Sequence, residues 1–262
     1  MTKREKILAA VTMICILSVI SLTVFFCLPE NQRTPSSVPD STETPPREPP
    51  LPSPQPTATQ APLPEGFSDA LKYIPDAVVA LSYYSEDNFM GRRVKGYEAN
   101  RAILTTEACT ALKKAADTLR DQGYLIYIYD AYRPTDAVKD FIAWGEDEDD
   151  MLRKEDFYPT LTKKELFSQY ISSDSKHSRG STVDLTIIHS DGTPVSMGCR
   201  FDYFHELAHT FTALVDAKIH ENRMILRRAM EAAGFQGSST EWWHFRLTEE
   251  PYPHQAFNFY VK

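Results

Sequence analysis

The sequence predicts an α+β domain, a small and mainly antiparallel sheet with packed helices, preceded by one transmembrane helix and a disordered stalk. Three observations support this prediction. The chain begins with a long uncharged run, continues through a proline-rich segment, and then alternates helix-like with strand-like patterns. Long, irregular segments separate these patterns, which favours an α+β arrangement over regular βαβ repeats.

The amino-terminal apolar run is long enough to cross a membrane. Residues 7–28 contain no charged side chain, and at about 1.5 Å per helical residue they span a hydrocarbon core of about 30 Å. Three basic residues precede the run, which favours a cytoplasmic flank. Bulky Phe26 stands before Cys27, where signal-peptide cleavage or lipidation requires small residues. We therefore expect a cytoplasmic tail at 1–6, an uncleaved single-pass anchor in the cell membrane and an extracytoplasmic remainder.

A proline-rich linker follows the expected anchor. Residues 29–65 hold twelve of the eighteen prolines, mixed with Ser, Thr, Glu and Gln. Proline removes backbone hydrogen-bond donors, and the segment contains too few large apolar residues to form a core. The segment is expected to be an extended stalk, a spacer through a cell wall, which leaves 66–262 as one folded domain.

Composition restricts the function of this domain. The net charge of −8 argues against nucleic acid as a partner, because nucleic-acid binding needs a basic footprint. The acidic run EDEDD at 146–150 lacks the glycine and spacing of a calcium loop and is expected to be solvated. An outside compartment would permit a disulfide between Cys109 and Cys199, but two cysteines form no framework pattern, so their pairing stays open.

Helices and strands are predicted from periodicity and run length. Helical spacing that ends near a glycine indicates a helix, whereas short apolar or aromatic runs indicate buried strands. The predicted helices are 105–122, 161–171 and 217–233, and the predicted strands are 124–130, 183–189 and 241–247.

Three side chains form a candidate metal site. His177 and Asp184 lie seven positions apart, and on an ideal strand they would face opposite ways. Gly180 between them allows the chain to turn so that both can meet one ion. His244 is the third candidate, and two histidines with one carboxylate are a known ligand set for catalytic zinc.

Two further side chains suggest hydrolysis. Glu241 precedes His244 by three residues, so a turn or bulge would bring it to the water of a bound metal, from which it could take a proton. Arg133 could stabilise the negative charge that develops on an attacked carbonyl oxygen, with Asp130 orienting it.

Each of these residues also has a purely structural interpretation, and a rival motif exists. His205 and His209 belong to HELAH, which satisfies H-E-x-x-H and on a helix would place both imidazoles on one zinc with Glu206 as base. The surrounding FDYFHELAHTF lacks the marks of a long helix, and a third ligand is not evident beyond His220 or Glu221.

A family resemblance favours the first site. The segments that carry it are, in order, YYSEDNFMGRRVKGY at 83–97, DAYRP at 130–134, SKHSRGSTVD at 175–184, MGCRFDYF at 197–204 and AGFQGSSTEWWHF at 233–245. They resemble the motifs of D-alanyl-D-alanine dipeptidases of the VanX type, zinc peptidases grouped with the VanY-type D,D-carboxypeptidases. HELAH follows the fourth motif, where the family has its own short run, and is interpreted as coincidental.

The resemblance implies a fold of the Hedgehog and D,D-peptidase kind with one Zn²⁺ per domain. It implies that His177, Asp184 and His244 are the zinc ligands. Thr182 stands where the family usually has alanine, a small departure beside the expected metal.

The resemblance also implies roles around the metal. Glu241 would be the catalytic base, and Arg133 would stabilise the tetrahedral intermediate. Asp202 and Tyr83 would hold the ammonium group of the substrate, and Ser175 would lie near its carboxylate end.

The leading interpretation is a membrane-anchored, zinc-dependent D-alanyl-D-alanine dipeptidase. Its expected partners are a small D-amino-acid dipeptide or a peptidoglycan peptide, and the membrane through the amino-terminal helix. The family's dipeptidases are typically cytoplasmic, so the expected outside location raises an alternative, a D,D-carboxypeptidase or endopeptidase on peptidoglycan stem peptides. A catalytically inactive wall-binding module is a second alternative. The presence of every residue that the proposed chemistry needs argues against it.

Overall fold

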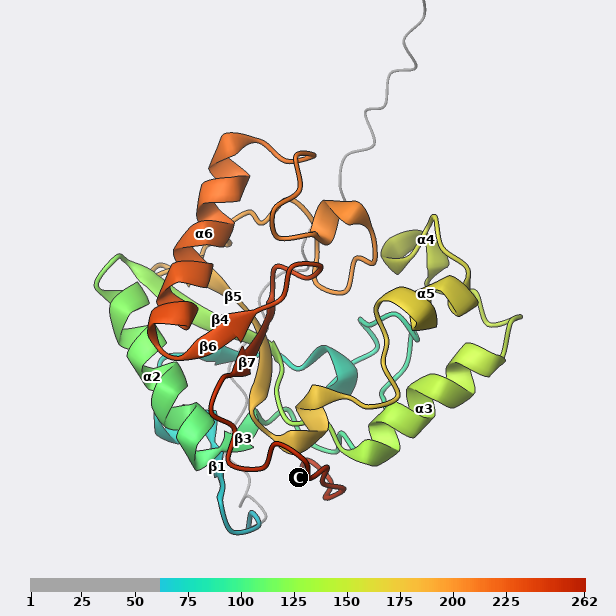
Figure 1. Cartoon of the computed structure of the whole chain (residues 1–262), viewed down its shortest axis with the longest axis horizontal. Coiled ribbons are helices and arrows are strands. Elements are labelled where there is room, and N and C mark those ends of the chain that lie inside the picture. The colour runs from blue at the N-terminus through green and yellow to red at the C-terminus, as the bar shows by residue number, and fades with distance from the viewer. Residues whose placement is uncertain (1–61) are drawn as a thin grey trace, which may run out of the picture. The chain divides into compact units, whose positions relative to one another are not determined.

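A computed structural model describes residues 62–262, drawn in colour in Figure 1. The expected cytoplasmic tail at 1–6, the anchor at 7–28 and most of the linker at 29–65 lie outside the described residues. Within 62–262, no helix is both long and apolar enough to cross a membrane.

A five-stranded sheet forms the centre of the domain. Its order is β2 (Val78–Val79), β4 (Tyr124–Asp130), β5 (Thr182–His189), β7 (His244–Leu247) and β6 (Phe235–Gly237). Only the β2–β4 pair is parallel, so this sheet is mainly antiparallel, as predicted. A separate antiparallel pair joins β1 (Phe67–Asp69) to β3 (Ile103–Thr105).

The central strand β5 separates the core from the functional face. Its residues are buried from Thr182 to Ile188, and successive side chains point to opposite faces. Val183, Leu185 and Ile187 join the apolar core. Asp184 therefore points to the other face, which leaves a buried carboxylate available for chemistry.

Two long helices pack against each other beside the sheet (Figure 1). α2 (Thr106–Arg120) begins where the Thr105 side chain accepts a hydrogen bond from the Ala108 amide. α6 (Ala217–Ala232) begins where the Asp216 side chain accepts from the Ile219 amide. Each cap satisfies an amide that the first helical turn leaves without a partner.

Three shorter helices gather on the opposite side of the domain in Figure 1. They are α3 (Thr135–Glu146), α4 (Lys154–Phe157) and α5 (Lys163–Gln169). The acidic run 146–150 ends α3 and continues into an exposed turn, as predicted. Single-turn 3₁₀ helices complete the fold: η2 (Ala70–Lys72), η3 (Ser82–Tyr84), η4 (Lys176–Arg179) and η5 (Glu206–Ala208).

The predicted helices and two of the predicted strands are confirmed to within two residues at each end. The strand predicted at 241–247 is wrong in its first half, because Glu241, Trp242 and Trp243 form a turn. The Trp242 amide donates to the Ala208 carbonyl at 3.1 Å and is therefore not available to β5, whereas the next carbonyl, that of Trp243, already accepts from the Leu185 amide of β5 at 3.1 Å. Cys109 and Cys199 are both buried, and they do not form a disulfide with each other.

The last residues of the chain fold back over the segment that leads into α3. The Thr135 amide donates to the Phe257 carbonyl at 3.1 Å, and Val261 bridges Tyr97 in parallel. The Phe259 ring stacks on Tyr132 with centroids 4.1 Å apart. This carboxy-terminal tail therefore supports the backbone on both sides of Arg133.

Candidate active site

Three neighbouring strands place polar side chains in one row across the sheet. Asp130 at the end of β4 is the register partner of Asp184 on β5, and Asp184 is in turn the partner of His244 at the start of β7. A register shift between Ile128 and Asp130 ends the regular β4–β5 pairing at this row. Residues distant in sequence are therefore brought together by strand pairing alone.

His177 reaches the same row from η4, one turn before β5. Gly180 ends this turn with φ of 80°, a left-handed conformation that glycine adopts without steric cost. The predicted turn at Gly180 is therefore confirmed. The His177 Nδ1 lies 2.7 Å from the Ala131 carbonyl oxygen. A carbonyl only accepts hydrogen bonds, so Nδ1 carries a proton, and in the neutral ring the Nε2 lone pair is the one available to a metal.

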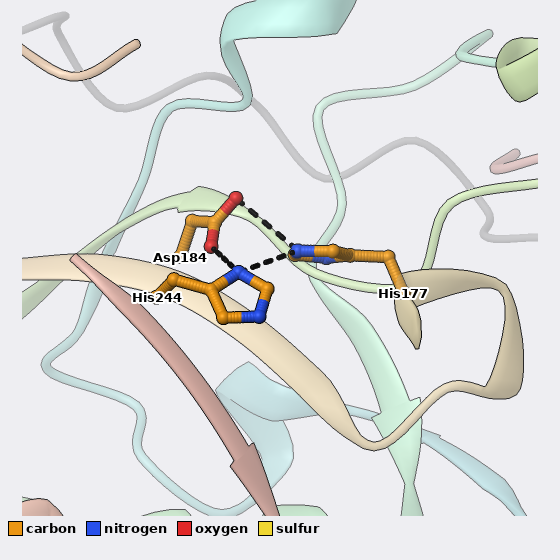
Figure 2. Close-up of side chains that lie close together, drawn as sticks. All are labelled: His177, Asp184 and His244. Atoms are coloured by element: carbon orange, nitrogen blue, oxygen red, sulfur yellow. Dashed lines mark hydrogen bonds and ion pairs between the residues drawn. The ribbon is translucent and has the colours of Figure 1, made fainter. Parts of the chain in front are cut away.

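The side chains of His177, Asp184 and His244 point toward one another in Figure 2. His177 Nε2 lies 3.3 Å from His244 Nδ1 and 3.3 Å from Asp184 Oδ2. His244 Nδ1 lies 2.9 Å from Asp184 Oδ1. Among the described residues, this is the one group of three or more potential ligands whose donor atoms all lie within 4.8 Å of one another.

The donor set suits a zinc ion. Two atoms at zinc–nitrogen distances of about 2.0–2.1 Å and the tetrahedral angle are about 3.3 Å apart, close to the separations found here. The Ala131 carbonyl accepts a hydrogen bond from His177 Nδ1, and such a bond outside the metal site fixes the tautomer of a ligating imidazole. Burial alone would raise the pKa of Asp184, but His177 and His244 outweigh it and hold the pKa below its usual value.

Glu241 stands beside this cluster because of the turn that precedes β7. The His244 amide donates to the Glu241 carbonyl at 3.3 Å, and Glu241 Oε2 lies 3.9 Å from His244 Nδ1. The turn anticipated from the ligand chemistry is thus present, whereas the continuous strand is not. Burial raises the pKa of the Glu241 carboxyl to about 7.

The Arg133 guanidinium is held at the opposite side of the row. Its Nε and Nη2 donate to Asp130 Oδ2 at 3.0 and 2.8 Å. Its central carbon lies 4.9 Å from the ring centre of Tyr83 and 5.1 Å from that of Phe141. The expected orienting role of Asp130 fits this geometry, and Nη2 lies 3.9 Å from Asp184 Oδ2.

The remaining expected substrate contacts line the same pocket. Asp202 is buried and has φ of 58°, a left-handed value uncommon for residues other than glycine. Its Oδ2 accepts a 2.8 Å hydrogen bond from the Tyr83 hydroxyl, and burial raises its pKa well above the usual value. Ser175 precedes η4 and has its Oγ 3.5 Å from Arg133 Nη1.

One pocket of about 200 Å³ contains all of the predicted site residues. Its lining combines aromatic side chains, among them Phe89, Phe141 and Phe204, with the polar and ionisable groups described above. A small apolar-walled pocket with convergent polar and ionisable groups is typical of an enzyme site for a small ligand.

The HELAH residues do not assemble a metal site. His205 and His209 flank the single turn η5, and both have extended backbone rather than helical backbone. His205 Nδ1 accepts from the Leu207 amide at 3.0 Å, and His209 Nε2 lies 3.1 Å from the Tyr170 hydroxyl. The one-face placement that H-E-x-x-H requires is therefore absent here.

Sequence reasoning overlooked several residues of this site. Phe141 was missed because α3 was not predicted, although its buried Ala137, Val138, Phe141 and Trp144 follow a helical spacing. Tyr97, whose hydroxyl donates to Asp130 Oδ1 at 2.6 Å, carries no local signal of its role. Lys176 was also missed, although it directly precedes His177.

The sequence profile of the D-Ala-D-Ala dipeptidase family matches residues 64–262. The chain belongs to this family. It is 44% identical over 181 residues to a D-alanyl-D-alanine dipeptidase of Enterococcus faecalis, which covers 68% of this chain and 90% of that protein. It is 42% identical over 182 residues to one from Enterococcus faecium, which covers 69% and 90%. A crystal structure of the vancomycin resistance D,D-pentapeptidase VanY with Zn(II) aligns over 62% of this chain and 84% of that chain, with 15% identity and a TM-score of 0.37.

Proposed function

We propose that this member of the dipeptidase family hydrolyses the D-alanyl-D-alanine dipeptide with the help of one zinc ion. The observation that carries the proposal is the convergence of His177, Asp184 and His244 in a pocket that also holds an acid–base candidate and a cation. Zinc in such a site supplies an acidified water and polarises the carbonyl of the substrate.

Glu241 is the proton carrier in this proposal. A carboxylate beside the ligand cluster can accept a proton from the attacking water and return it to the leaving amine. Its pKa of about 7, raised by burial, lies close to the working pH of such a group. With a dication bound nearby, the pKa of Glu241 would fall again, which would favour its ionised, proton-accepting form.

Arg133 stabilises charge on the substrate carbonyl oxygen. Attack on an amide places negative charge there, and a guanidinium fixed in advance interacts more strongly with that oxyanion than with the neutral amide. The two hydrogen bonds to Asp130 Oδ2 and the two flanking rings keep the guanidinium in place.

The charge of the pocket favours a substrate with a free ammonium group. Three buried or partly buried carboxylates line the pocket, Asp184, Asp202 and Glu241. A fourth, Asp130, holds the deep Arg133 guanidinium, so four carboxylates face one deep cation. A dication and one ammonium would neutralise this formal surplus. Asp202, with its Tyr83 hydrogen bond, is the carboxylate we assign to the ammonium.

The volume of the pocket favours a dipeptide over a stem peptide. Sites for drug-sized ligands commonly occupy about 300–1,000 Å³, whereas this pocket holds about 200 Å³. A buried carboxyl group inside it, which an incoming ammonium would ionise, suits a substrate whose amino terminus lies close to the scissile bond. The alternative, a D,D-carboxypeptidase or endopeptidase on wall peptides, gains support from the anchor expected at 7–28, which would place the domain outside the membrane.

The test compares two substrates. Full-length protein purified in detergent and loaded with zinc is offered D-Ala-D-Ala and, separately, a muramyl pentapeptide. We expect cleavage of the dipeptide and little action on the pentapeptide. Cleavage of the pentapeptide with the dipeptide left intact would overturn the proposal in favour of the wall-peptide alternative. Binding of either peptide without cleavage would instead identify this protein as a catalytically inactive wall-binding module.

A further inference from the structure

The rim of the pocket carries a cation that the proposed mechanism does not use. Two cationic side chains line the pocket, Arg133 and Lys176. The Arg133 side chain is 11% exposed and is committed to Asp130. The Lys176 side chain is 45% exposed. Lys176 is therefore the cation that an incoming ligand can reach without breaking the buried network.

Lys176 is paired with a carboxylate at the same rim. Its Nζ donates a 2.9 Å hydrogen bond to Asp174 Oδ2, and the Asp174 side chain is 78% exposed and also lines the pocket. Exposed ion pairs of this kind contribute little free energy, because water and salt screen both partners. The Asp174 carboxylate can therefore be exchanged for another carboxylate at low cost.

A dipeptide needs such a cation. Its carboxylate end would enter a pocket lined by Asp184, Asp202 and Glu241, and like charges repel. A positive group at the rim would offset this repulsion and favour substrates that carry a free carboxylate there. Ser175, the expected neighbour of that end, adjoins Lys176 in the chain but supplies no charge.

We propose that Lys176 is a specificity-determining residue that binds the carboxy-terminal carboxylate of the substrate. In the free protein the Asp174 carboxylate pairs with the Lys176 ammonium. When the substrate binds, its carboxylate replaces that of Asp174. The inference rests on the proposed function, because it takes a free dipeptide as the ligand. No bond is made or broken in this step, which exchanges one ion pair for another.

The test uses paired substrates and two variants of the zinc-loaded, full-length protein. D-Ala-D-Ala and its carboxy-terminal amide differ in the charge at the end that Lys176 would bind. Lys176→Gln should raise KM for the dipeptide about fivefold, the factor that corresponds to an exposed charge pair, and leave kcat within about twofold. Asp174→Asn should lower that KM roughly twofold by removing the competing carboxylate. Neither variant should change KM for the amide.

Lys164→Gln serves as the matched control. Lys164 is an exposed lysine on α5 that does not line the pocket, so its removal should leave KM for both substrates unchanged. A second readout is salt, because KM of the wild type should rise with ionic strength more steeply than KM of Lys176→Gln.

The outcomes separate the two proposals. If wild-type protein cleaves the acid and the amide with equal KM, or if Lys176→Gln affects both substrates alike, the role of Lys176 is refuted while the dipeptidase function stands. If wild-type protein leaves the dipeptide intact, the proposed function fails. Calorimetric binding of the intact dipeptide and amide to the same variants then still decides whether Lys176 recognises the carboxylate.

Discussion

The Tyr97 hydroxyl donates a 2.6 Å hydrogen bond to Asp130 Oδ1, on the side of the carboxylate opposite the Arg133 guanidinium. Both Tyr97 and Asp130 are buried. The phenol thereby holds one oxygen of Asp130 while the other oxygen holds Arg133. The position of the guanidinium therefore depends on a residue that does not itself line the pocket.

Tyr97→Phe tests this dependence. The change removes one hydroxyl and keeps the ring that packs edge-on against Tyr83. We expect kcat to fall about tenfold with little change in KM, because a freer guanidinium weakens the transition state more than the ground state. The loss of a hydrogen bond to a buried charge should also lower the free energy of unfolding by about 1–3 kcal/mol.

Tyr132→Phe is the control for that prediction. Tyr132 is buried like Tyr97, but its hydroxyl forms hydrogen bonds with the backbone of Phe259 and not with Asp130. It should lower stability while leaving kcat near the wild-type value. Equal losses of kcat in both variants would show that turnover falls because the fold is destabilised, and not because the Arg133 guanidinium is displaced.

Glu241→Gln should separate proton transfer from metal binding. The amide keeps the size of the side chain but cannot accept the proton, so kcat should fall by about 10²–10⁴. Zinc content, measured by elemental analysis of the dialysed protein, should stay at one ion per chain. Turnover within tenfold of the wild type would contradict the assignment of Glu241 as the base.

His244→Ala should remove both zinc and activity. Two remaining ligands cannot hold the ion tightly, and a chelator should likewise abolish turnover of the wild type until zinc is restored. Added zinc should raise the melting temperature of the wild type, since a ligand of the folded state stabilises it, but not that of the variant. His254→Ala, at an exposed histidine outside the cluster, should behave as the wild type.

Gly180→Ala should destabilise the turn that delivers His177. Gly180 has φ of 80°, and an added Cβ would lie 2.3 Å from Phe67 Cε1. Gly123→Ala is the matched control, because Gly123 has φ of 85° with nothing within 4 Å of the added carbon. We expect about 1–2 kcal/mol of backbone cost in both and a further ~1–3 kcal/mol of overpacking in Gly180→Ala alone. Urea unfolding of both variants measures the difference, and equal costs would mean that the Phe67 ring moves aside freely.

The sequence was informative where local pattern and chemistry agree. The helices at 105–122 and 217–233 follow from helical spacing that ends near a glycine, and His177, Asp184 and His244 converge as their ligand chemistry suggested. The strand at 241–247 was overextended because an aromatic run favours strand locally, whereas the Trp242 amide bonds to Ala208, a partner distant in sequence. Strands of two or three residues, such as β2 and β6, are too short to show any periodicity.

The roles of Tyr97 and Lys176 could not be derived from local pattern. Tyr97 acts through a hydrogen bond across 33 residues, and a tyrosine with such a role looks like any core aromatic. Lys176 resembles an ordinary solvated lysine until the fold places it at the rim of the pocket. Both assignments require long-range placement, which single-sequence reasoning does not provide.

The carboxy-terminal tail bears on how this protein should be handled in the laboratory. Val261 bridges Tyr97, and Arg101 Nη1 donates to the Lys262 carbonyl at 2.8 Å. A purification tag or fusion partner joined after Lys262 would thus emerge next to the residue that bridges the backbone of Tyr97, whose hydroxyl is two hydrogen bonds away from Arg133. Affinity handles, reporter fusions and surface attachment should therefore avoid the carboxy terminus, so that Val261 and Lys262 keep their contacts.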